Sequence, residues 1–159
     1  MACVLPFGNG AERMLSNENI GAQVNNLQFN RHKSAHMYRA GLEGIAFSFV
    51  YGIQLLKDMG FTIDVMRVGN DNLFQSTIFA STIANLVNCK ITVVETTGAT
   101  GAAKAAGLKT GFYKTLKEAI GSNGEVMTYH PQESEEHEQA YQIWKLDLKK
   151  LSYKIEEPS

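Results

Sequence analysis

The segment from residue 61 to residue 95 constrains the fold of this chain more than any other part of it. The stretch "FTIDVMRVG" is β-branched and alternating, which predicts a strand that includes Ile63, Val65 and Val68. Turn-forming residues follow, and a helix is expected from Ser76 to about Val87. The stretch "CKITVVE" predicts a second strand. Strand, helix and strand with short connections favour an α/β fold, with a parallel or mixed sheet flanked by helices.

The turn before this helix has two interpretations. Gly69, Asn70, Asp71 and Asn72 tolerate the backbone angles of tight turns, so the loop can serve only to end the strand. A strand, a tight loop and a helix N-terminus also make a cradle, in which main-chain amides and the positive end of the helix dipole face a ligand. Ligands of such sheets collect at the carboxyl ends of strands, where Gly69 and Gly98 both lie.

A long helix is expected from Ser34, as its cap, to about Met59, with Gly60 ending it. Small residues occupy every fourth position, and each interior glycine costs about 0.5 to 1 kcal/mol relative to alanine. We therefore expect another helix or sheet backbone to approach Gly44 closely, with a ligand-facing role as the alternative. Apolar residues at helical spacing predict a buried stripe of Leu42, Ile45, Ala46, Phe49, Ile53 and Leu56.

The two ends of the chain are less regular. Residues 1–33 are expected to be loop, with one or two short strands near residues 22–29. Acidic residues begin and lysines end the last apolar-periodic segment, which predicts a helix from about Glu133 to Leu151, followed by a frayed tail. Between these ends, "TTGATGAAKAAGL" and "FYKTLKEAI" are expected to be helical and "GEVMTYHP" extended.

Composition excludes several classes of function. The 159 residues are 44% hydrophobic and 19% charged, which predicts a single domain over residues 1–159. A formal net charge of −1, with both signs spread along the chain, gives no footprint for nucleic acid or an anionic membrane. The apolar window "GIAFSFVYGIQLL" is too short to cross a bilayer, and the N-terminus has no signal-peptide pattern. Cys3, at an end expected to fray, and Cys89 support neither a disulfide nor a metal site, so we expect a cytoplasmic protein.

The stretch "TGATGAAKAAG" is a partial match to a dinucleotide-binding turn. Gly98 and Gly101 are present, but Lys104 stands where the closing glycine belongs, and the acidic candidate Glu118 lies in an expected helix. Close packing of this helix on a strand is the favoured interpretation. A reductase remains an alternative, which quenching of Trp144 fluorescence by NADPH would reveal.

The histidines make weak candidate sites. His32 and His36 have the spacing of a metal pair, but a helix that starts between them need not present both on one face. His130 and His137 are expected at the surface. Tyr141 and Trp144 are expected to pack against the body of the protein.

Four segments in order resemble the carbohydrate kinases of the xylulose, glycerol and gluconate group, in their C-terminal half. These are "LPFGNGAERM", similar to the family's Gly-Glu-Arg loop, "YRAGLEGIAFSF", "VGNDNLFQSTIF" and "VVETTGATGAAKAAG". Together with the last helix, the resemblance covers nearly the whole chain and looks strongest to xylulose kinases. It implies one lobe of the ribonuclease H-like, or actin-like ATPase, fold.

The resemblance also implies a function and a site. It implies the C-terminal, ATP-binding half of a phosphotransferase that moves the γ-phosphate of ATP, with Mg²⁺, to a ketose such as D-xylulose. Consecutive glycines are common in the family's loop, whereas Asn70 and Asp71 follow Gly69 here; Asp71 would repel a phosphate, so adenine or ribose is its expected neighbour unless magnesium intervenes. The residues implied at the nucleotide are Gly69, Asn70, Asp71, Asn72, Gln75 and Ser76.

In the family, residues needed for activity lie N-terminal to the segments matched here. Its catalytic aspartate and phosphate loops precede every segment matched here, and the sugar is bound mainly by the other lobe. We therefore expect this chain alone to be inactive, to meet its sugar substrate only through the missing N-terminal lobe, and to expose an apolar face that invites homodimers. The alternative is a non-catalytic, actin-like nucleotide-binding domain for assembly or regulation, which would associate when ATP is added.

Overall fold

The computed structural model describes residues 2–10, 12–121 and 124–156, with side chains up to Leu151. In this part of the chain the strands form two sheets. One pairs β1 (Cys3–Phe7) with β2 (Gly21–Asn25) in antiparallel fashion. The other has the order β3 (Val65–Gly69), β4 (Lys90–Val94), β5 (Glu125–Tyr129). Strand β3 is parallel to β4 and β5 is antiparallel to it, so this sheet is mixed.

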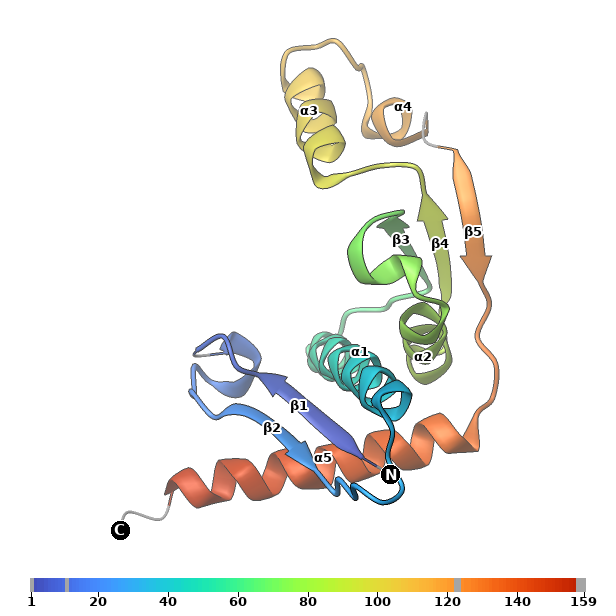
Figure 1. Ribbon diagram of the computed structural model, residues 1–159. Coiled ribbons are helices and arrows are strands. Elements are labelled where there is room, and N and C mark those ends of the chain that lie inside the picture. The colour runs from blue at the N-terminus through green and yellow to red at the C-terminus, as the bar shows by residue number, and fades with distance from the viewer. Residues whose placement is uncertain (1, 11, 122–123, 157–159) are drawn as a thin grey trace.

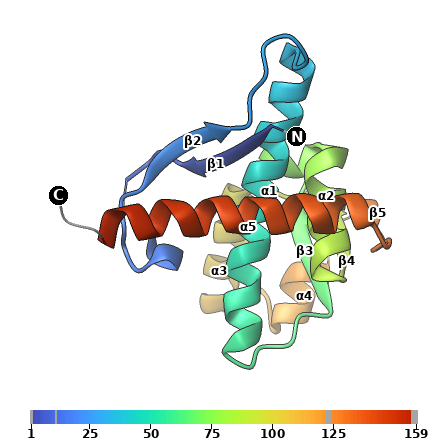
Figure 2. The same ribbon diagram turned by 90° about the horizontal axis from the view of Figure 1, so that it is seen from below.

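Helices surround these sheets. In Figure 1, α5 runs along one end of the molecule beneath β1 and β2, whereas α3 and α4 lie beyond the tip of β4 at the other end. Figure 1 also shows α1 and α2 between α5 and the larger sheet, and in Figure 2, seen from below, α5 crosses in front of α1. The described helices are α1 (Ser34–Asp58), α2 (Thr77–Val87), α3 (Gly98–Lys109), α4 (Leu116–Gly121), α5 (Glu135–Glu156) and the short 3-10 turns η1 (Arg13–Leu15) and η2 (Asn72–Gln75).

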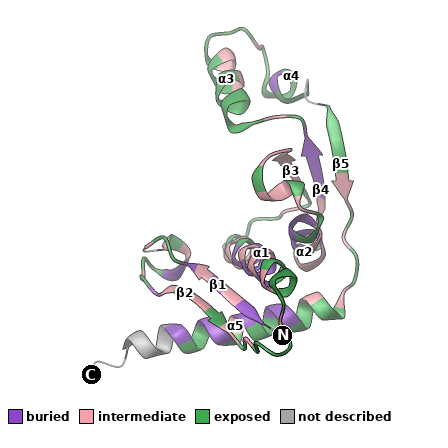
Figure 3. Ribbon diagram, in the orientation of Figure 1, coloured by how far each residue is buried: buried purple, intermediate pink, exposed green. Residues whose placement is uncertain are grey.

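The core lies where α1, α2 and α5 meet the two sheets, and it is drawn in purple in Figure 3. Every second residue of β1 points into it, and β4 is buried along nearly its whole length because β3 and β5 pair with its two edges. Trp144 from α5 is fully buried, as is Phe79 from α2, and Phe47 from α1 packs edge-on against the Trp144 ring. The predictions that Trp144 and Tyr141 pack against the body are confirmed.

The small-residue face of α1 is explained by β1. A Cβ atom added at Gly44 would collide with the main-chain oxygen of Val4, so only glycine allows the strand to lie this close to the helix. The predicted close approach of sheet backbone is confirmed at this position. The buried stripe is only partly right: Phe49 and Leu56 are about half exposed, and Glu43 and Phe47 are buried instead, because β1 and α2 cover a rotated face.

The N-terminal region is more ordered than its sequence suggests. Strand β1 was not expected, because its apolar run is short and contains Pro6, yet three of its residues belong to the core. The expectation that Cys3 lies at a frayed end is wrong: it is 7% exposed, and burial raises the pKa of its thiol to about 11. Ser34 is not the cap of α1, since the extended residue before the helix is Lys33, whose N–H donates to His36 Nδ1.

Three expectations for the C-terminal half also need correction. Helix α3 is almost wholly exposed, and a Cβ atom at Gly98 or Gly101 would meet no atom within 4 Å, so these glycines do not serve close helix-to-strand packing. Helix α5 continues to Glu156, past the expected start of a frayed tail; residues 157–159 lie outside the described part. His137 is half-buried rather than a surface residue, because its ring packs beside Asn85 of α2.

Candidate functional site

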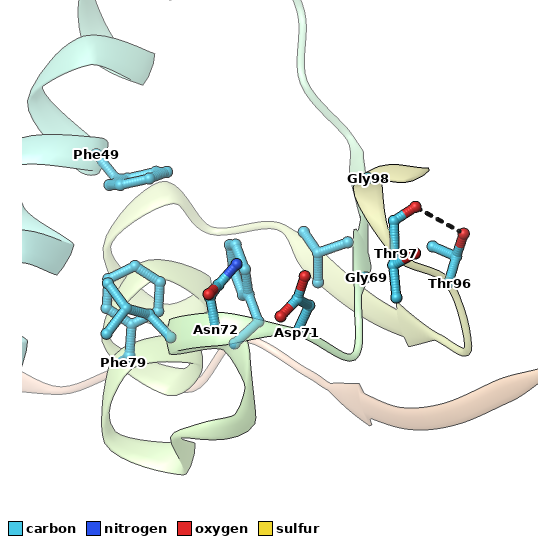
Figure 4. A pocket seen from close by; sticks show the side chains of 11 residues that line it. Phe49, Gly69, Asp71, Asn72, Phe79, Thr96, Thr97 and Gly98 are labelled. Carbon is cyan, nitrogen blue, oxygen red and sulfur yellow. Dashed lines mark hydrogen bonds between the residues drawn. The ribbon is translucent and has the colours of Figure 1, made fainter. Parts of the chain in front are cut away.

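A pocket of about 470 Å³ lies at the carboxyl ends of β3 and β4. Figure 4 shows that Phe49 and Phe79 stand at one end of it and Thr96 and Thr97 at the other, with Asp71 between them. The pocket therefore has an aromatic floor and a polar rim. The residues that line it are Phe49, Val68, Gly69, Asp71, Asn72, Leu73, Phe74, Phe79, Thr96, Thr97 and Gly98.

The loop after β3 is held in place through Asn70. Its N–H donates to the main-chain oxygen of Val94 at 2.9 Å and its side-chain amide donates to Glu95 Oε2 at 3.2 Å. Its own carbonyl oxygen accepts from Gln75 Nε2 at 3.3 Å. These bonds tie the start of the loop to the end of β4 and to Gln75. Asn72 has a φ of +50°, in the left-handed region, where Asn is favoured among non-glycine residues.

Gly69 is needed where the ends of the two strands converge. A Cβ atom at this position would stand 2.7 Å from the main-chain oxygen of Thr96, which is closer than real Cβ atoms come to an oxygen. A side chain here would push the ends of β3 and β4 apart and change the shape of the pocket rim. This glycine therefore has a steric role, whichever ligand the pocket accepts.

Two helices begin at the pocket. Ser76 caps α2, because its Oγ accepts a hydrogen bond from the N–H of Phe79 at 3.4 Å, which confirms the predicted start of this helix. Thr97 caps α3 in the same way, by accepting from the N–H of Thr100 at 3.3 Å. The polar rim thus combines a strand end, a 3-10 turn and the N-terminus of α3.

The floor is a cluster of three aromatic rings. Phe49 of α1 meets Phe79 edge-to-face with ring centroids 5.5 Å apart, and Phe74 lies 5.1 Å from Phe79 in a similar arrangement. Phe79 is fully buried, whereas Phe49 is 45% exposed. The floor can therefore present an apolar ring face to a planar ligand or to another side chain.

Asp71 is the one charged side chain among the residues that line this pocket. Two cationic side chains, Arg67 and Lys104, line a separate cavity of about 420 Å³ between the sheet and the helices α3 and α4. Val68, Gly69 and Thr96 border both cavities. The first pocket suits neutral and apolar groups, and it offers no side-chain cation to a phosphate.

The predicted site residues divide into two groups. Gly69, Asp71 and Asn72 line the pocket, as the sequence led us to expect of residues at a strand end. Asn70, Gln75 and Ser76 do not line it; they fix the loop and the start of α2. Sequence reasoning missed the remaining lining residues, although Gly98 was recognised as lying at the end of a strand.

The structure adds little support for a metal site at the histidines. His32 Nδ1 accepts from the N–H of Gln28 and His36 Nδ1 from that of Lys33, so both rings are used to fix the chain before α1. Among the described residues no three His, Cys, Asp or Glu side chains come together as a metal site. No helix in the described part of the chain has the length and apolarity needed to span a membrane.

The sequence of this chain was compared with those of known proteins. A scan against models of protein families gives no match. The chain is 33% identical over 114 residues to a glycerol kinase of Roseiflexus sp., covering 69% of this chain and 23% of that protein. It is 34% identical over 137 residues to glycerol kinase 1 of Streptomyces coelicolor, covering 82% of this chain and 26% of that protein. The chain thus spans about a quarter of the length of these relatives.

Solved structures define the fold. The chain superposes on a xylulose kinase from Rhodospirillum rubrum with a TM-score of 0.77 and 17% identity, covering 98% of this chain and 32% of that one. It superposes on Plasmodium falciparum glycerol kinase with ADP with a TM-score of 0.74 and 21% identity, covering 94% of this chain and 30% of that one. A gluconate kinase is a further neighbour. The fold is therefore that of the actin-like ATPases, with a ribonuclease H-like arrangement of a mixed sheet and helices. The homologues and structural neighbours are carbohydrate kinases.

Proposed function

We propose that this chain is the C-terminal, nucleotide-binding part of a carbohydrate kinase, which transfers the γ-phosphate of ATP to a hydroxyl group of a sugar or polyol. The observation that carries the proposal is the pocket at the ends of β3 and β4, since it lies where open α/β sheets bind ligands and is shaped by Gly69 and the loop after it. The relatives, which are named as kinases, agree with it.

The chemistry of the pocket favours the nucleoside part of ATP. The ring face of Phe49 is available to the adenine, and the side chains of Asp71 and Asn72 can accept and donate hydrogen bonds to the ribose hydroxyls. A phosphate beside Asp71 would be repelled. We therefore assign base and ribose to this chain and the β- and γ-phosphates to groups outside the pocket.

Magnesium fits the described residues less well. Asp71 is a single carboxylate at the rim, and Mg²⁺ in kinases is held by one or two carboxylates together with substrate phosphates. Because the phosphates are assigned elsewhere, we derive no role for magnesium at Asp71 and place its ligands in the rest of the kinase.

The identity of the sugar that accepts the phosphate and the role of the rest of the polypeptide are proposals. A ketose such as D-xylulose stays our prediction, and the glycerol kinase relatives name glycerol as the competing acceptor. We place the sugar contacts and the catalytic base in the larger remainder of the polypeptide, because the chain spans about a quarter of its curated relatives. The chain alone should then consume no ATP in response to a sugar, and a cytoplasmic location fits this function.

An amide NMR titration tests the proposal. ATP with magnesium should shift the amides of residues 69–76, adenosine should shift the same amides, and NADPH should leave the amides of Gly98 and Gly101 unshifted. Shifts with NADPH alone, centred on Gly98 and Gly101, would replace the kinase by a reductase. Sugar-dependent ATP consumption by the 159-residue chain would contradict the assignment of catalysis to the remainder. Light scattering that rises when ATP is added would favour the assembly domain instead.

A further inference from the structure

We infer that the cavity between the sheet and the helices α3 and α4, called the α3–α4 cavity below, is a binding site for a small organic acid with a carboxylate on an apolar body. Its volume is about 420 Å³. Pockets that bind small molecules measure roughly 300 to 1,000 Å³, so the cavity is large enough for such a ligand. The inference goes beyond the proposed function and does not depend on it.

The walls of the α3–α4 cavity are largely aliphatic. A Cβ atom added at Gly101 would meet nothing within 4 Å, so α3 does not close onto the sheet at this point. Leu116 and Ile120 of α4 are 60% and 40% exposed, which shows that the apolar lining is not packed as a core. The apolar residues that line the cavity are Val68 of β3, Val94 of β4, Ala105 and Leu108 of α3, and Leu116, Ala119 and Ile120 of α4.

Two cationic side chains lie on opposite walls of this cavity. Successive side chains of a strand point to opposite faces, and Met66 and Val68 pack against the core, so Arg67 lies on the face toward α3 and α4. Lys104 of α3 also lines the cavity and is half-buried, whereas Lys109 in the same helix is exposed. Among the described residues that line the cavity none is acidic. The cavity therefore carries positive charge beside its apolar surface.

This charge determines which occupant fits. Covering a cation is costly unless a negative group pairs with it, so an uncharged occupant would leave Arg67 and Lys104 without a counter-charge from the ligand. A carboxylate matches the parallel N–H donors of a guanidinium group, and a hydrocarbon body matches the aliphatic walls. A nucleotide fits less well, because the described lining has no aromatic ring on which a base could stack.

The α3–α4 cavity and the aromatic pocket are separate but adjacent. Val68, Gly69 and Thr96 border both of them. The wall between them is main chain at its closest point, since a Cβ atom at Gly69 would stand 2.7 Å from the Thr96 oxygen. The organic acid would therefore bind on the far side of this wall from the nucleoside.

Octanoate is the probe for this site. Titration of the 159-residue chain should shift the amides of Lys104, Leu108 and Ile120 in NMR spectra. Octan-1-ol, which has the body without the charge, should bind about tenfold more weakly. Acetate, which has the charge without the body, should bind about a hundredfold more weakly. Equal affinity for octanoate and octan-1-ol, or no shift of these amides by octanoate, would overturn the inference.

A first variant pair tests the charge. Arg67→Gln should weaken octanoate binding about tenfold and leave octan-1-ol binding unchanged, because only the carboxylate loses a partner. A loss of shape or stability would weaken both ligands alike. Lys109→Gln is the matched control, since Lys109 is not a lining residue, and it should change neither affinity. An Arg67→Gln variant that binds octanoate as tightly as the natural chain would contradict the assignment.

A second variant pair tests the location. Ala105 lines the cavity and its neighbour Ala106 does not, although both are exposed residues of α3. The ring introduced by Ala105→Phe should fill the cavity and weaken octanoate binding at least tenfold. Ala106→Phe should leave the affinity unchanged. Equal affinities of the two variants, with both folded by circular dichroism, would place octanoate elsewhere and overturn the inference.

Competition separates this site from the nucleotide pocket. Saturating ATP should leave octanoate bound, and complete displacement would assign the cavity to the nucleotide instead. Loss of octanoate binding in the longer polypeptide would show that its own residues fill the cavity, and would also overturn the inference. Octanoate binding without nucleotide binding would keep this site and remove the kinase, whereas the reverse result would keep the kinase alone.

Discussion

The indole N–H of Trp144 donates a hydrogen bond to the main-chain oxygen of Val4 at 3.0 Å, across 140 residues of sequence. The same oxygen faces the bare Cα of Gly44, where a side chain would collide with it. One carbonyl group thus lies between the last helix and the first one. The contact explains why Trp144 can be fully buried without an unsatisfied N–H.

Gly44→Ala should destabilise the chain. The added methyl group would force β1 away from α1, and overpacking of this kind costs about 1 to 3 kcal/mol. Gly41→Ala is the matched control in the same helix, because a Cβ atom there meets nothing within 4 Å. It should stabilise α1 by about 0.5 to 1 kcal/mol. Urea unfolding followed by circular dichroism measures both, and equal stability of the two variants would contradict the steric account.

Trp144→Phe should lower the free energy of unfolding. It leaves the Val4 oxygen without this donor, and an unsatisfied buried group costs about 1 to 3 kcal/mol. Tyr141→Phe is the control, because the buried Tyr141 hydroxyl has no hydrogen-bond partner among the described residues, and burial raises its pKa to about 12. Removing that hydroxyl should be neutral or stabilising. A Tyr141→Phe variant as unstable as Trp144→Phe would mean that the Tyr141 hydroxyl itself stabilises the folded chain, and would contradict this account.

Stability should fall when the pH is lowered from a value above 6.5 to a value below it, because of His137. Burial lowers the pKa of this ring below its ordinary value of 6.5. Asn85 fixes the neutral form: its Oδ1 accepts from the N–H of Gln132, so its Nδ2 is the donor to His137 Nδ1. The unfolded chain then binds the proton more readily than the folded chain, and stability is lost as pH falls through 6.5 toward the folded pKa.

His137→Gln keeps an acceptor for Asn85 without the titration. The difference in urea midpoint between the two pH values should therefore be smaller for the variant than for the natural chain. Identical pH dependence of the two proteins would exclude His137 as the cause.

Gly69→Ala should disturb the pocket as well as the fold. Its methyl group would press on the Thr96 oxygen, and we expect a loss of about 1 to 3 kcal/mol in stability together with loss of nucleotide binding. Gly101→Ala has open space around it and should be tolerated in both respects. The pair also separates two functions, since a reductase would need Gly101 more than Gly69.

Asp71→Asn should raise the affinity for ATP and leave that for adenosine nearly unchanged. The substitution removes the one charge that lines the pocket while it keeps a side chain able to bond to ribose. Calorimetric titration of both ligands at low salt measures the difference. Equal changes for ATP and adenosine would show that Asp71 does not repel the phosphates, and would remove the reason for assigning them outside the pocket.

Local patterns in the sequence predict the elements that depend on local rules. The cap at Ser76, the turn of Gly69 to Asn72 and the strands on either side of α2 follow from turn chemistry and periodicity. The role of Gly44 could also be predicted, because an interior glycine in a long helix needs a packing reason.

Features that depend on contacts distant in sequence were missed. Strand β1 is short and contains Pro6, and it is stabilised by Trp144, which no local pattern connects to it. The pocket floor joins Phe49 of α1 to Phe79 of α2, and only the packing of the two helices brings these rings together. The exposure of α3 likewise depends on whether another element packs against this helix. Its glycines and alanines do not determine that.

The bond between Trp144 and Val4 also sets an order for folding. Trp144 follows Val4 by 140 residues, so a ribosome makes β1 well before α5. Helix α1 can pack on β1 early, whereas the contacts of Trp144 with Val4 and Phe7 can form only after α5 has been made. A nascent chain that stalls before Trp144 would therefore hold β1 against α1 without the helix that completes its cover.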